Sequence, residues 1–288
     1  MMMNHVNPLR TAVITGCTSG IGLELTRKLL TDQWRIIGLN RSPFPADDPE
    51  IQTALNSGQL LSVQARLTNY ASLRTALEQI RAQTDTIDIL FNNAGGSTPT
   101  LQYSDQGLEL HFELQTVVPY IIYRELYDLL RHGGMKTVVN TSTTSFRMMR
   151  AFDLGILERP VSFRKLFGPY AASKLALSLW TREAASTTAA DGIRLLSADP
   201  GGNNTLKSSK ASGLPFYIRP VMKLFFAHPS RGASLLHDAA LGTVRHESGV
   251  FLVKNKEASL PFMEQGASVL QRVHEIYEQK YLGTQDDL

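Results

Sequence analysis

Apolar residues follow two spacings along the chain, and segments with these spacings alternate. Short β-branched runs bounded by glycine, such as residues 11–15, are typical of buried strands. Apolar residues that recur every three or four positions, as from Leu23 to Leu30, are typical of helices packed on one face. The first spacing predicts strands at 11–15, 34–39, 60–64, 87–91, 137–141, 193–198 and 250–253. The second predicts helices at 23–30, 69–82, 105–131, 170–190, 230–241 and 262–282.

Strands that alternate with helices predict an α/β fold with one doubly wound parallel sheet of the Rossmann type and helices on both faces. We expect about seven strands and a C-terminal helix. No repeat or linker divides the chain, so residues 1–288 are predicted to form one domain. Two segments rich in aromatic and apolar residues, 144–168 and 203–228, are predicted to cover a substrate pocket. Their phenylalanines fit a lipophilic or aromatic substrate, but they could equally pack the lid and the core.

Charge and cysteine content narrow the class of protein. The chain has 29 Lys and Arg against 26 Asp and Glu, a net charge of +3 without a dense basic run, which argues against nucleic acid as a partner. Cys17 is the single cysteine of the sequence, which excludes an internal disulfide and favours a reducing compartment. Neither a signal peptide nor an apolar run of roughly 18 residues, long enough to span a bilayer, is evident. A cytoplasmic location is therefore expected.

A glycine-rich segment, Gly16-Cys17-Thr18-Ser19-Gly20-Ile21-Gly22, joins the first predicted strand to the first predicted helix. A strand, a glycine loop and a helix N-terminus in this order present backbone N–H groups to a pyrophosphate. A glycine-rich loop is also often only a tight turn, and the loop alone does not separate these possibilities. Cys17 has no base partner nearby in the sequence, so we interpret it as a spectator thiol.

Asn40 and Arg41 end the second predicted strand, where the adenosine ribose of a dinucleotide would lie. An acidic residue at this place binds the ribose hydroxyls, whereas an arginine suits a 2′-phosphate. Arg41 therefore favours NADP(H) over NAD(H). The alternative is an ordinary surface arginine.

Tyr170 and Lys174 lie four residues apart at the start of a predicted helix, so their side chains share one face. A neighbouring ammonium favours the phenolate, so Lys174 is expected to lower the pKa of Tyr170. Such a tyrosine donates or accepts a proton near neutral pH. The spacing also arises by chance, so its meaning depends on its context. The hydroxyl cluster 142–145 ends the fifth strand, at the edge where catalytic side chains belong, although such clusters are also common in turns.

Together, these segments resemble the short-chain dehydrogenase/reductase family over nearly the whole chain. The resemblance rests on residues 15–22, Asn92-Asn93-Ala94-Gly95, residues 140–143, Tyr170-x-x-x-Lys174 and Pro200-Gly201. Within the family, the chain is most similar to the retinol-dehydrogenase-like branch. That similarity rests on Gly107-Leu108-Glu109-Leu110, on Phe152-Asp153-Leu154 and on Ser248-Gly249-Val250-Phe251.

The resemblance implies a role for each matching position. Tyr170 would be the catalytic acid/base, and Lys174 would bind the nicotinamide ribose and lower the Tyr170 pKa. Thr143 stands where most members have the serine that holds the substrate oxygen, and Ser142 takes that role if the strand register shifts by one. Gln115 stands at the position of the proton-relay asparagine. The implied cofactor contacts come from Gly16, Thr18, Ser19, Gly20, Ile21, Gly22, Arg41, Arg66, Leu67, Asn93, Ala94, Gly95, Tyr170, Lys174, Pro200, Gly201, Asn203 and Thr205.

Three positions depart from the family pattern. Gln115 has a longer amide than asparagine, so the relay water would be held differently. Arg66 replaces the acidic residue that usually meets the adenine, and its guanidinium could stack on the ring instead. Asn203 replaces a residue that is usually apolar.

The residues and the resemblance predict an oxidoreductase, a ketoreductase in the reducing direction, that transfers a hydride between NADP(H) and a carbonyl or secondary alcohol. A second hypothesis is a catalytically weak NADP(H)-binding sensor or scaffold, motivated by Arg66, Gln115 and Thr143. A third is a cofactor-assisted epimerisation or dehydration. The expected partners are a small carbonyl or alcohol substrate and, if the protein forms a homo-oligomer, a second copy of the chain. Neither a metal ion nor stable membrane insertion is expected, although residues 214–226 could rest on a membrane surface.

Overall fold

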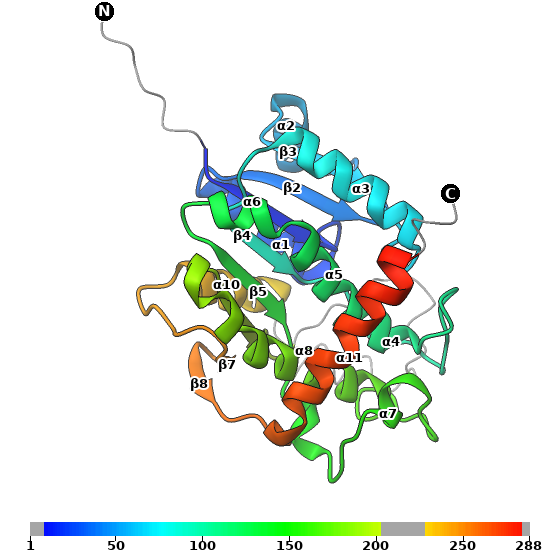
Figure 1. Ribbon diagram of the computed structural model, residues 1–288. Helices are drawn as coiled ribbons and strands as arrows, with labels where there is room; N and C mark the ends of the chain where they lie inside the picture. Colours follow the sequence, from blue (N-terminus) through cyan, green and yellow to red (C-terminus); the bar gives the residue numbers. More distant parts are fainter. Residues whose placement is uncertain (1–8, 203–227, 284–288) are drawn as a thin grey trace, which may run out of the picture.

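The computed structural model describes residues 9–202 and 228–283, which contain one eight-stranded sheet flanked by helices (Figure 1). The strand order is β3-β2-β1-β4-β5-β6-β7-β8. Strands β1 to β7 pair in parallel, and β8 pairs with β7 in the antiparallel direction. The strands are β1 (Thr11–Thr15), β2 (Arg35–Asn40), β3 (Leu60–Gln64), β4 (Ile89–Asn92), β5 (Thr137–Thr141), β6 (Arg194–Asp199), β7 (Phe251–Val253) and β8 (Lys256–Ala258).

Helical segments connect the strands. The α-helices are α1 (Gly20–Thr31), α2 (Pro49–Ser57), α3 (Tyr70–Gln83), α4 (Leu110–Phe112), α5 (Val118–Glu125), α6 (Tyr127–His132), α7 (Gly155–Glu158), α8 (Pro169–Ala184), α10 (Pro229–Leu241) and α11 (Gly266–Ile276). The π segments are η1 (Glu113–Val117) and η5 (Tyr277–Leu282), and the 3₁₀ segments are η2 (Ser145–Met148), η3 (Ser186–Asp191) and η4 (Met263–Gln265). None of the helices within the described ranges is long and apolar enough to cross a lipid bilayer.

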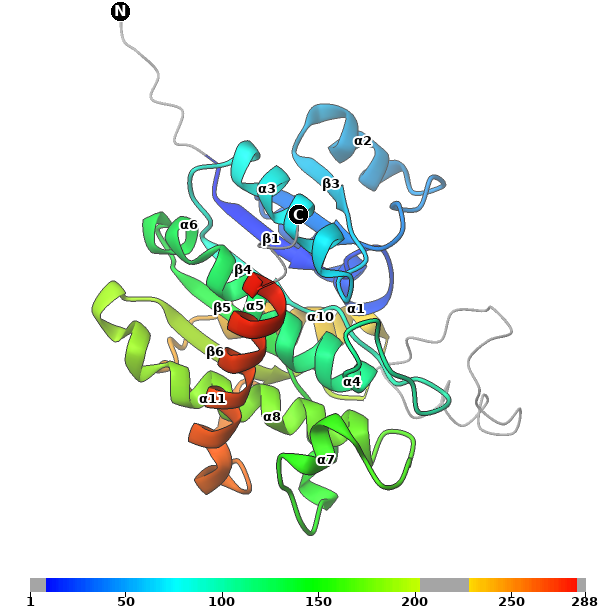
Figure 2. The ribbon, with the colours of Figure 1, turned by 45° about the vertical axis from the view of Figure 1, so that its right-hand side comes forward.

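Each face of the sheet buries its own apolar cluster, because successive side chains of a strand point to opposite faces. Val13 of β1 packs in the cluster that includes residues of α3, α5, α8 and α11. Its neighbours Ala12 and Ile14 pack in the cluster that includes residues of α1, α2 and α10. Figure 2 shows α3, α5, α8 and α11 on the near side of the sheet and α10 behind it. The doubly wound α/β fold predicted from the sequence is thus confirmed.

The seven predicted strands lie within two residues of the observed bounds. The eighth strand, β8, was not predicted, because it has only three residues, two of them are charged, and none is buried. It follows a turn at Lys254 and Asn255, whose φ angles of 51° and 56° are both left-handed. Two consecutive left-handed residues are typical of a type I′ hairpin, which accounts for the antiparallel pairing of β7 and β8.

The predicted helix over 105–131 is wrong in its extent. Helical structure begins at Leu110, widens into the π segment η1, and is interrupted at Leu126 before α6. Pro119 explains part of this irregularity, because it has no N–H to donate to the carbonyl of Gln115, four residues earlier. Apolar periodicity persists through such an interruption, so it did not reveal it.

One helix was not predicted, and two other helices have boundaries that differ from the prediction. Helix α2 was not predicted, although Asp48 caps it by accepting the N–H of Ile51 at 3.2 Å and Pro49 occupies its first turn. Helix α8 ends at Ala184, and the predicted remainder is the 3₁₀ segment η3. The last helix begins at Gly266, after the short segment η4. The predicted lid 144–168 contains η2 and α7, whereas residues 203–227 of the second lid lie outside the described residues.

Candidate active site

The parallel strands bring the predicted site residues to one edge of the sheet, because parallel strands share one carboxyl edge. Strands β1, β4, β5 and β6 are neighbours, and their carboxyl ends precede the glycine loop, the Asn93 segment, the hydroxyl cluster and the Pro-Gly turn, respectively. Tyr170 and Lys174 join this edge from the first two turns of α8. Asn203 and Thr205, both predicted to bind cofactor, lie outside the described residues.

The glycine loop packs tightly against the segment that follows β4. Gly16 has a left-handed φ of 67°, and a Cβ there would lie 2.8 Å from the Cα of Ala94. A Cβ on Gly22 would lie 2.2 Å from the carbonyl oxygen of Gly16, so only glycine fits. Asn93 Nδ2 donates to the carbonyls of Thr15 and Gly16, both at 3.2 Å. These contacts fix the loop against the segment 93–95.

The first turn of α1 is open to an anion. Thr18, Ser19, Gly20 and Ile21 are partly exposed, and Ser19, the N-cap residue, makes no side-chain cap hydrogen bond. No acidic residue stands in the first turn of the helix. Free N–H groups and the positive end of the helix dipole together favour a phosphate at this place.

Hydrogen bonds between Asn40 and Cys17 hold the glycine loop against the end of β2. Asn40 is 1% exposed, and its Oδ1 accepts from the N–H of Cys17 at 2.7 Å and from its thiol at 3.1 Å. Burial raises the pKa of the Cys17 thiol to about 12, so it stays protonated near neutral pH. Both properties agree with a spectator thiol.

Two arginines stand at the carboxyl ends of adjacent strands. Arg41 follows β2, Arg66 lies two residues beyond β3, and both are exposed. Neither guanidinium forms an ion pair with any residue in the described ranges. Leu67, in contrast, is buried in the apolar cluster that includes residues of α3, and its contact with a cofactor stays a prediction.

Tyr170 and Lys174 both lie at the carboxyl edge of the sheet, but the pKa of Tyr170 is shifted in the direction opposite to the prediction. Burial raises the pKa of Tyr170 to about 12, the Asp199 carboxylate raises it further, and a hydrogen bond with the Thr143 hydroxyl lowers it. Lys174 is 4% exposed, and its Nζ donates to the carbonyl of Thr141 at 2.6 Å. Burial lowers the pKa of Lys174 to about 7. The predicted lowering of the Tyr170 pKa by the lysine is therefore wrong: the shift is upward, burial and Asp199 cause it, and Thr143 rather than Lys174 opposes it.

The two candidate hydroxyls at the end of β5 have different surroundings. Ser142 is 2% exposed; its Oγ lies 2.7 Å from the Oγ of Ser178 and donates to the carbonyl of Lys174 at 3.2 Å. Thr143 is partly exposed and hydrogen-bonds Tyr170. Of the two, only Thr143 has its hydroxyl directed to the phenol.

Asp199 is a site residue that the sequence did not single out. It is 6% exposed, and its carboxylate accepts from the Thr144 hydroxyl and from the N–H of Gly201, each at 2.8 Å. The available signal was an acidic residue at the end of a core strand, directly before Pro200 and Gly201. Its negative charge faces Tyr170 and disfavours the phenolate.

The sequence profile described as short chain dehydrogenase matches residues 10–153, half of the chain. The chain belongs to this family of oxidoreductases. It is 26% identical to a polyprenol dehydrogenase of Danio rerio over 259 residues, 86% of this chain and 79% of the relative. It is 29% identical to retinol dehydrogenase 12 of Mus musculus over 249 residues, 85% of this chain and 77% of the relative, which agrees with the predicted branch. The NADPH-bound carbonyl reductase from chicken fatty liver shares the fold, with a TM-score of 0.64, 18% identity, and 87% and 94% of the two chains covered.

Gln115 occupies the position at which the short-chain dehydrogenase resemblance expects the relay asparagine. The residue lies in η1 and is 1% exposed. Its Nε2 donates to the carbonyl of Gly96 at 3.1 Å, and a Cβ on Gly95 would lie 2.8 Å from its Oε1. That Oε1 is buried without a hydrogen-bond partner among the described residues. Gln115 therefore fastens the segment after β4, and its relay role stays a prediction.

His111 of α4 is a second residue that sequence reasoning missed. Its ring meets the Tyr170 ring edge-on, with 6.1 Å between centroids. The only sequence signal was the Glu-x-His pattern of residues 109–111, which lies within a predicted helical run.

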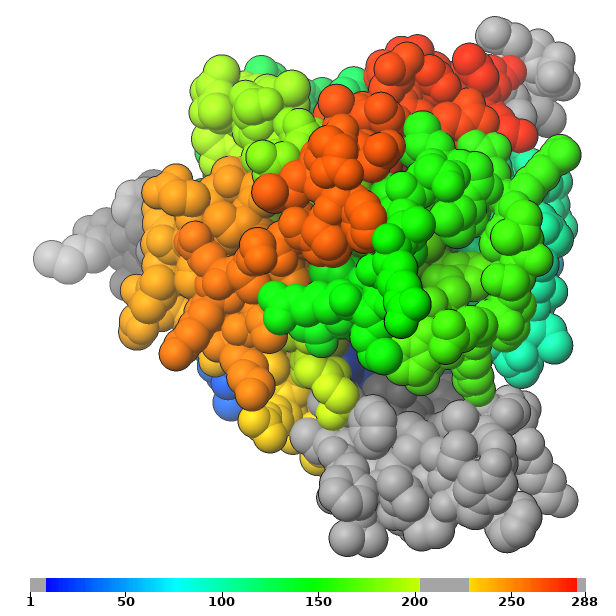
Figure 3. Space-filling view, turned by 90° about the horizontal axis from the view of Figure 1, so that it is seen from below, coloured from blue at the N-terminus to red at the C-terminus, as the bar shows by residue number. Residues whose placement is uncertain are grey.

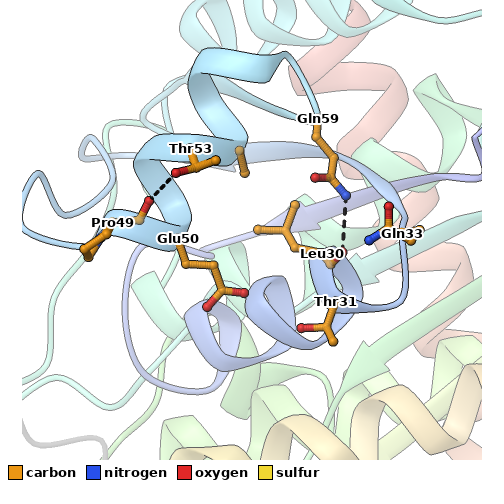
Figure 4. A pocket seen from close by; sticks show the side chains of 8 residues that line it. Leu30, Thr31, Gln33, Pro49, Glu50, Thr53 and Gln59 are labelled. Carbon is orange, nitrogen blue, oxygen red and sulfur yellow. Dashed lines mark hydrogen bonds between the residues drawn. The ribbon is translucent and has the colours of Figure 1, made fainter.

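A separate surface hollow of about 420 Å³ lies between the end of α1 and helix α2 (Figure 4). Thr53 donates to the carbonyl of Pro49, and Gln59 donates to that of Leu30, so these polar groups are engaged within the protein. The hollow is away from the Tyr170 edge of the sheet and contains none of the predicted site residues. Its lining consists of Leu30, Thr31, Gln33, Pro49, Glu50, Thr53, Ala54 and Gln59.

Proposed function

We propose that the protein transfers a hydride between NADP(H) and the carbonyl or secondary alcohol carbon of a lipophilic or aromatic small molecule. The observation that carries this proposal is the Tyr170 phenol, hydrogen-bonded with Thr143 at the carboxyl edge of the sheet and followed one helical turn later by the buried Lys174. A phenol, a hydroxyl and an amine arranged in this way suit proton transfer to an oxygen atom.

The residues at this edge fit a dinucleotide. The open first turn of α1 and the close-packed glycines would hold the pyrophosphate. Arg41 would pair with a 2′-phosphate, which supports NADP(H) over NAD(H), and Arg66 would lie over or beside the adenine. Lys174 would bind the nicotinamide ribose, and the segment 93–95 would lie along the cofactor. When bound, the cofactor supplies or accepts the hydride.

In carbonyl reduction, Tyr170 gives its proton to the substrate oxygen. Because the pKa of Tyr170 is raised to about 12, the phenol holds its proton at neutral pH and is ready to donate it. The Thr143 hydroxyl would hydrogen-bond the same oxygen and stabilise its developing negative charge. Lys174, which is 4% exposed, would act on the orientation of the cofactor and on the local charge rather than on the substrate oxygen.

The lid segment 144–168 supports a lipophilic substrate only in part. Figure 3 shows this segment, in green, at the surface beside the orange and red C-terminal residues. Phe146 and Phe152 are buried against rings of the C-terminal part, so they pack the core. Phe163 lies 6.4 Å from the His111 ring and Phe167 is 42% exposed, which leaves these two for contact with an apolar molecule.

The test of the function is cofactor consumption with a panel of aromatic and long-chain ketones and aldehydes. NADPH absorbance is expected to fall with members of the panel, and NADH is expected to serve less well. Tight NADPH binding without consumption across the panel would instead support the sensor or scaffold. A changed substrate with no net consumption would support the epimerisation or dehydration.

Replacing Arg41 by alanine is expected to raise the KM for NADPH about ten- to hundredfold, because a charge-assisted contact to phosphate is lost. The KM for NADH should change little, since NADH has no 2′-phosphate. Steady-state kinetics with both cofactors measure the difference. Arg35→Ala, at the opposite end of β2, is the matched control and should change neither value. Equal losses with both cofactors would contradict the assignment.

Replacing Asp199 by asparagine is expected to move the pH profile of alcohol oxidation to lower pH. Oxidation needs the phenolate of Tyr170, and the Asp199 charge raises the pKa of that phenol. Removing the charge lowers this pKa, so more phenolate is present at a given pH. The rate of alcohol oxidation measured against pH reports the shift, and an unchanged profile would refute the electrostatic role.

A further inference from the structure

Glu109 and His111 form a hydrogen-bonded pair that is closed off from solvent. Their side chains are 0% and 1% exposed, and His111 Nδ1 lies 2.6 Å from Glu109 Oε1. The second carboxylate oxygen accepts the N–H of Phe112 at 2.9 Å, as the N-cap of α4. Both carboxylate oxygens are therefore engaged, and the pair is anchored to the start of a helix.

The contacts of the imidazole select one tautomer. An ionised carboxylate only accepts hydrogen bonds, so Nδ1 of His111 carries the proton. The N–H of Thr98 only donates, and it lies 3.0 Å from Nε2, which must therefore accept. Neutral His111 satisfies both contacts at once. Because both ring nitrogens are engaged, the ring is not available as an acid or base toward a substrate.

This one ring contacts three parts of the candidate active site. Its edge-to-face contact with Tyr170 has an interplanar angle of 84°, and the Phe163 ring of the lid lies 6.4 Å away. Through Thr98 it also holds the far end of the segment that begins at Asn93. The near end of that segment is anchored separately, because Thr15 Oγ1 accepts the N–H groups of Asn93 and Ala94.

We propose that Glu109 and His111 are positioning residues, which hold the Tyr170 phenol and the Thr98 end of the segment 93–98 in the geometry that proton transfer requires. The inference rests on the proposed function of Tyr170. Misplacement of a reacting group by about 1 Å can lower a rate about a hundredfold. Loss of the ring should therefore act on turnover, whereas cofactor affinity should persist because the near end of the segment keeps its own anchor.

The test compares His111→Ala with His111→Phe. His111→Ala is expected to lower kcat about ten- to hundredfold, with the Kd for NADPH within about twofold of its original value. His111→Phe keeps a ring against Tyr170 but cannot accept from Thr98, so it should recover part of kcat. Hydrogen exchange at the Thr98 amide should be faster in both variants, and this readout does not depend on activity.

Two further comparisons separate positioning from general stability. Glu109→Gln keeps an oxygen that accepts from His111 Nδ1–H, so it should retain far more turnover than Glu109→Ala. His246 is also buried, at 7% exposure, and its Nδ1 lies 3.4 Å from Glu257 Oε1, away from the candidate site. His246→Ala should lower the thermal stability without changing kcat.

Several results would overturn the positioning role of Glu109 and His111. If the wild type is active, an unchanged kcat in both His111→Ala and His111→Phe would overturn it. A merely structural role would give a different result: turnover and NADPH binding would be lost together, and neither His111→Phe nor Glu109→Gln would restore them. That result would also overturn the proposal. If His111→Ala does not fold, the kcat values of His111→Phe, Glu109→Gln and Glu109→Ala test the positioning role. A wild type that consumes no NADPH with any carbonyl overturns the proposed function instead, and the Thr98 exchange rate still reports on the hydrogen bond.

Discussion

Tyr170→Phe is expected to lower kcat about a hundred- to ten-thousandfold, the range that a positioned general acid contributes. The change removes one hydroxyl and leaves the ring, so the edge-on contact with His111 should remain. NADPH binding should persist, because the contacts proposed for the cofactor come mainly from the glycine loop, Arg41 and Lys174. Single-turnover kinetics and fluorescence titration with NADPH measure the two quantities separately.

The matched control is Tyr127→Phe. Tyr127 lies on helix α6, and its hydroxyl donates to Asp191 of η3 at 2.5 Å. The substitution should cost about 1 kcal/mol of unfolding free energy, as the loss of one hydrogen bond does, and leave kcat unchanged. Near-normal turnover by Tyr170→Phe would refute the acid/base assignment. Loss of NADPH binding in that variant would show that the phenol acts on the cofactor site instead.

The pKa of Tyr170 adds a pH signature to this prediction. A group whose pKa is raised keeps its proton to higher pH, so a phenol with a pKa of about 12 remains a donor throughout the neutral range. Carbonyl reduction should therefore not decline from deprotonation of Tyr170 near neutral pH. Alcohol oxidation, which needs the phenolate, should still be rising there.

The sequence predicted the sheet well because strands β1, β2, β4, β5 and β6 are mostly apolar and almost fully buried. The same kind of pattern could not reveal the π segment η1, since one additional residue in a helical turn leaves the apolar spacing nearly unchanged. It also could not reveal β8, whose short polar sequence depends on a hairpin turn rather than on burial. Elements defined by core packing were predictable, whereas those defined by local backbone geometry were not.

The candidate site shows the same division. The sequence shows directly that the glycine loop joins a strand to a helix. It also shows that Tyr170 and Lys174 lie four residues apart at a helix start. Burial of the phenol, which reverses the expected direction of its pKa, depends on the tertiary structure. His111 depends on Thr98 from a separate loop, and a contact between distant segments leaves no periodic trace. Charge environments and contacts between loops therefore had to come from the structure.

Thr143→Val is expected to lower kcat about a hundred- to a thousandfold, the cost of losing one donor to a developing oxyanion. Valine has nearly the same shape as threonine, but it also removes the acceptor of the Ser145 N–H at 3.2 Å. The variant also removes the hydrogen bond that lowers the Tyr170 pKa. Thr143→Ser restores a hydroxyl at this position and should recover most of the turnover.

Ser142→Ala is the matched control, one residue earlier in the segment that follows β5. The Ser142 hydroxyl is engaged by two groups of α8, the hydroxyl of Ser178 and the carbonyl of Lys174. Its removal should cost about 1 kcal/mol of stability, since Ser178 still donates to the carbonyl of Lys174. The kcat should stay near its original value. If Ser142→Ala abolished turnover and Thr143→Val did not, the hydroxyl that meets the substrate oxygen would be Ser142, and the strand would have to shift by one residue in the active enzyme.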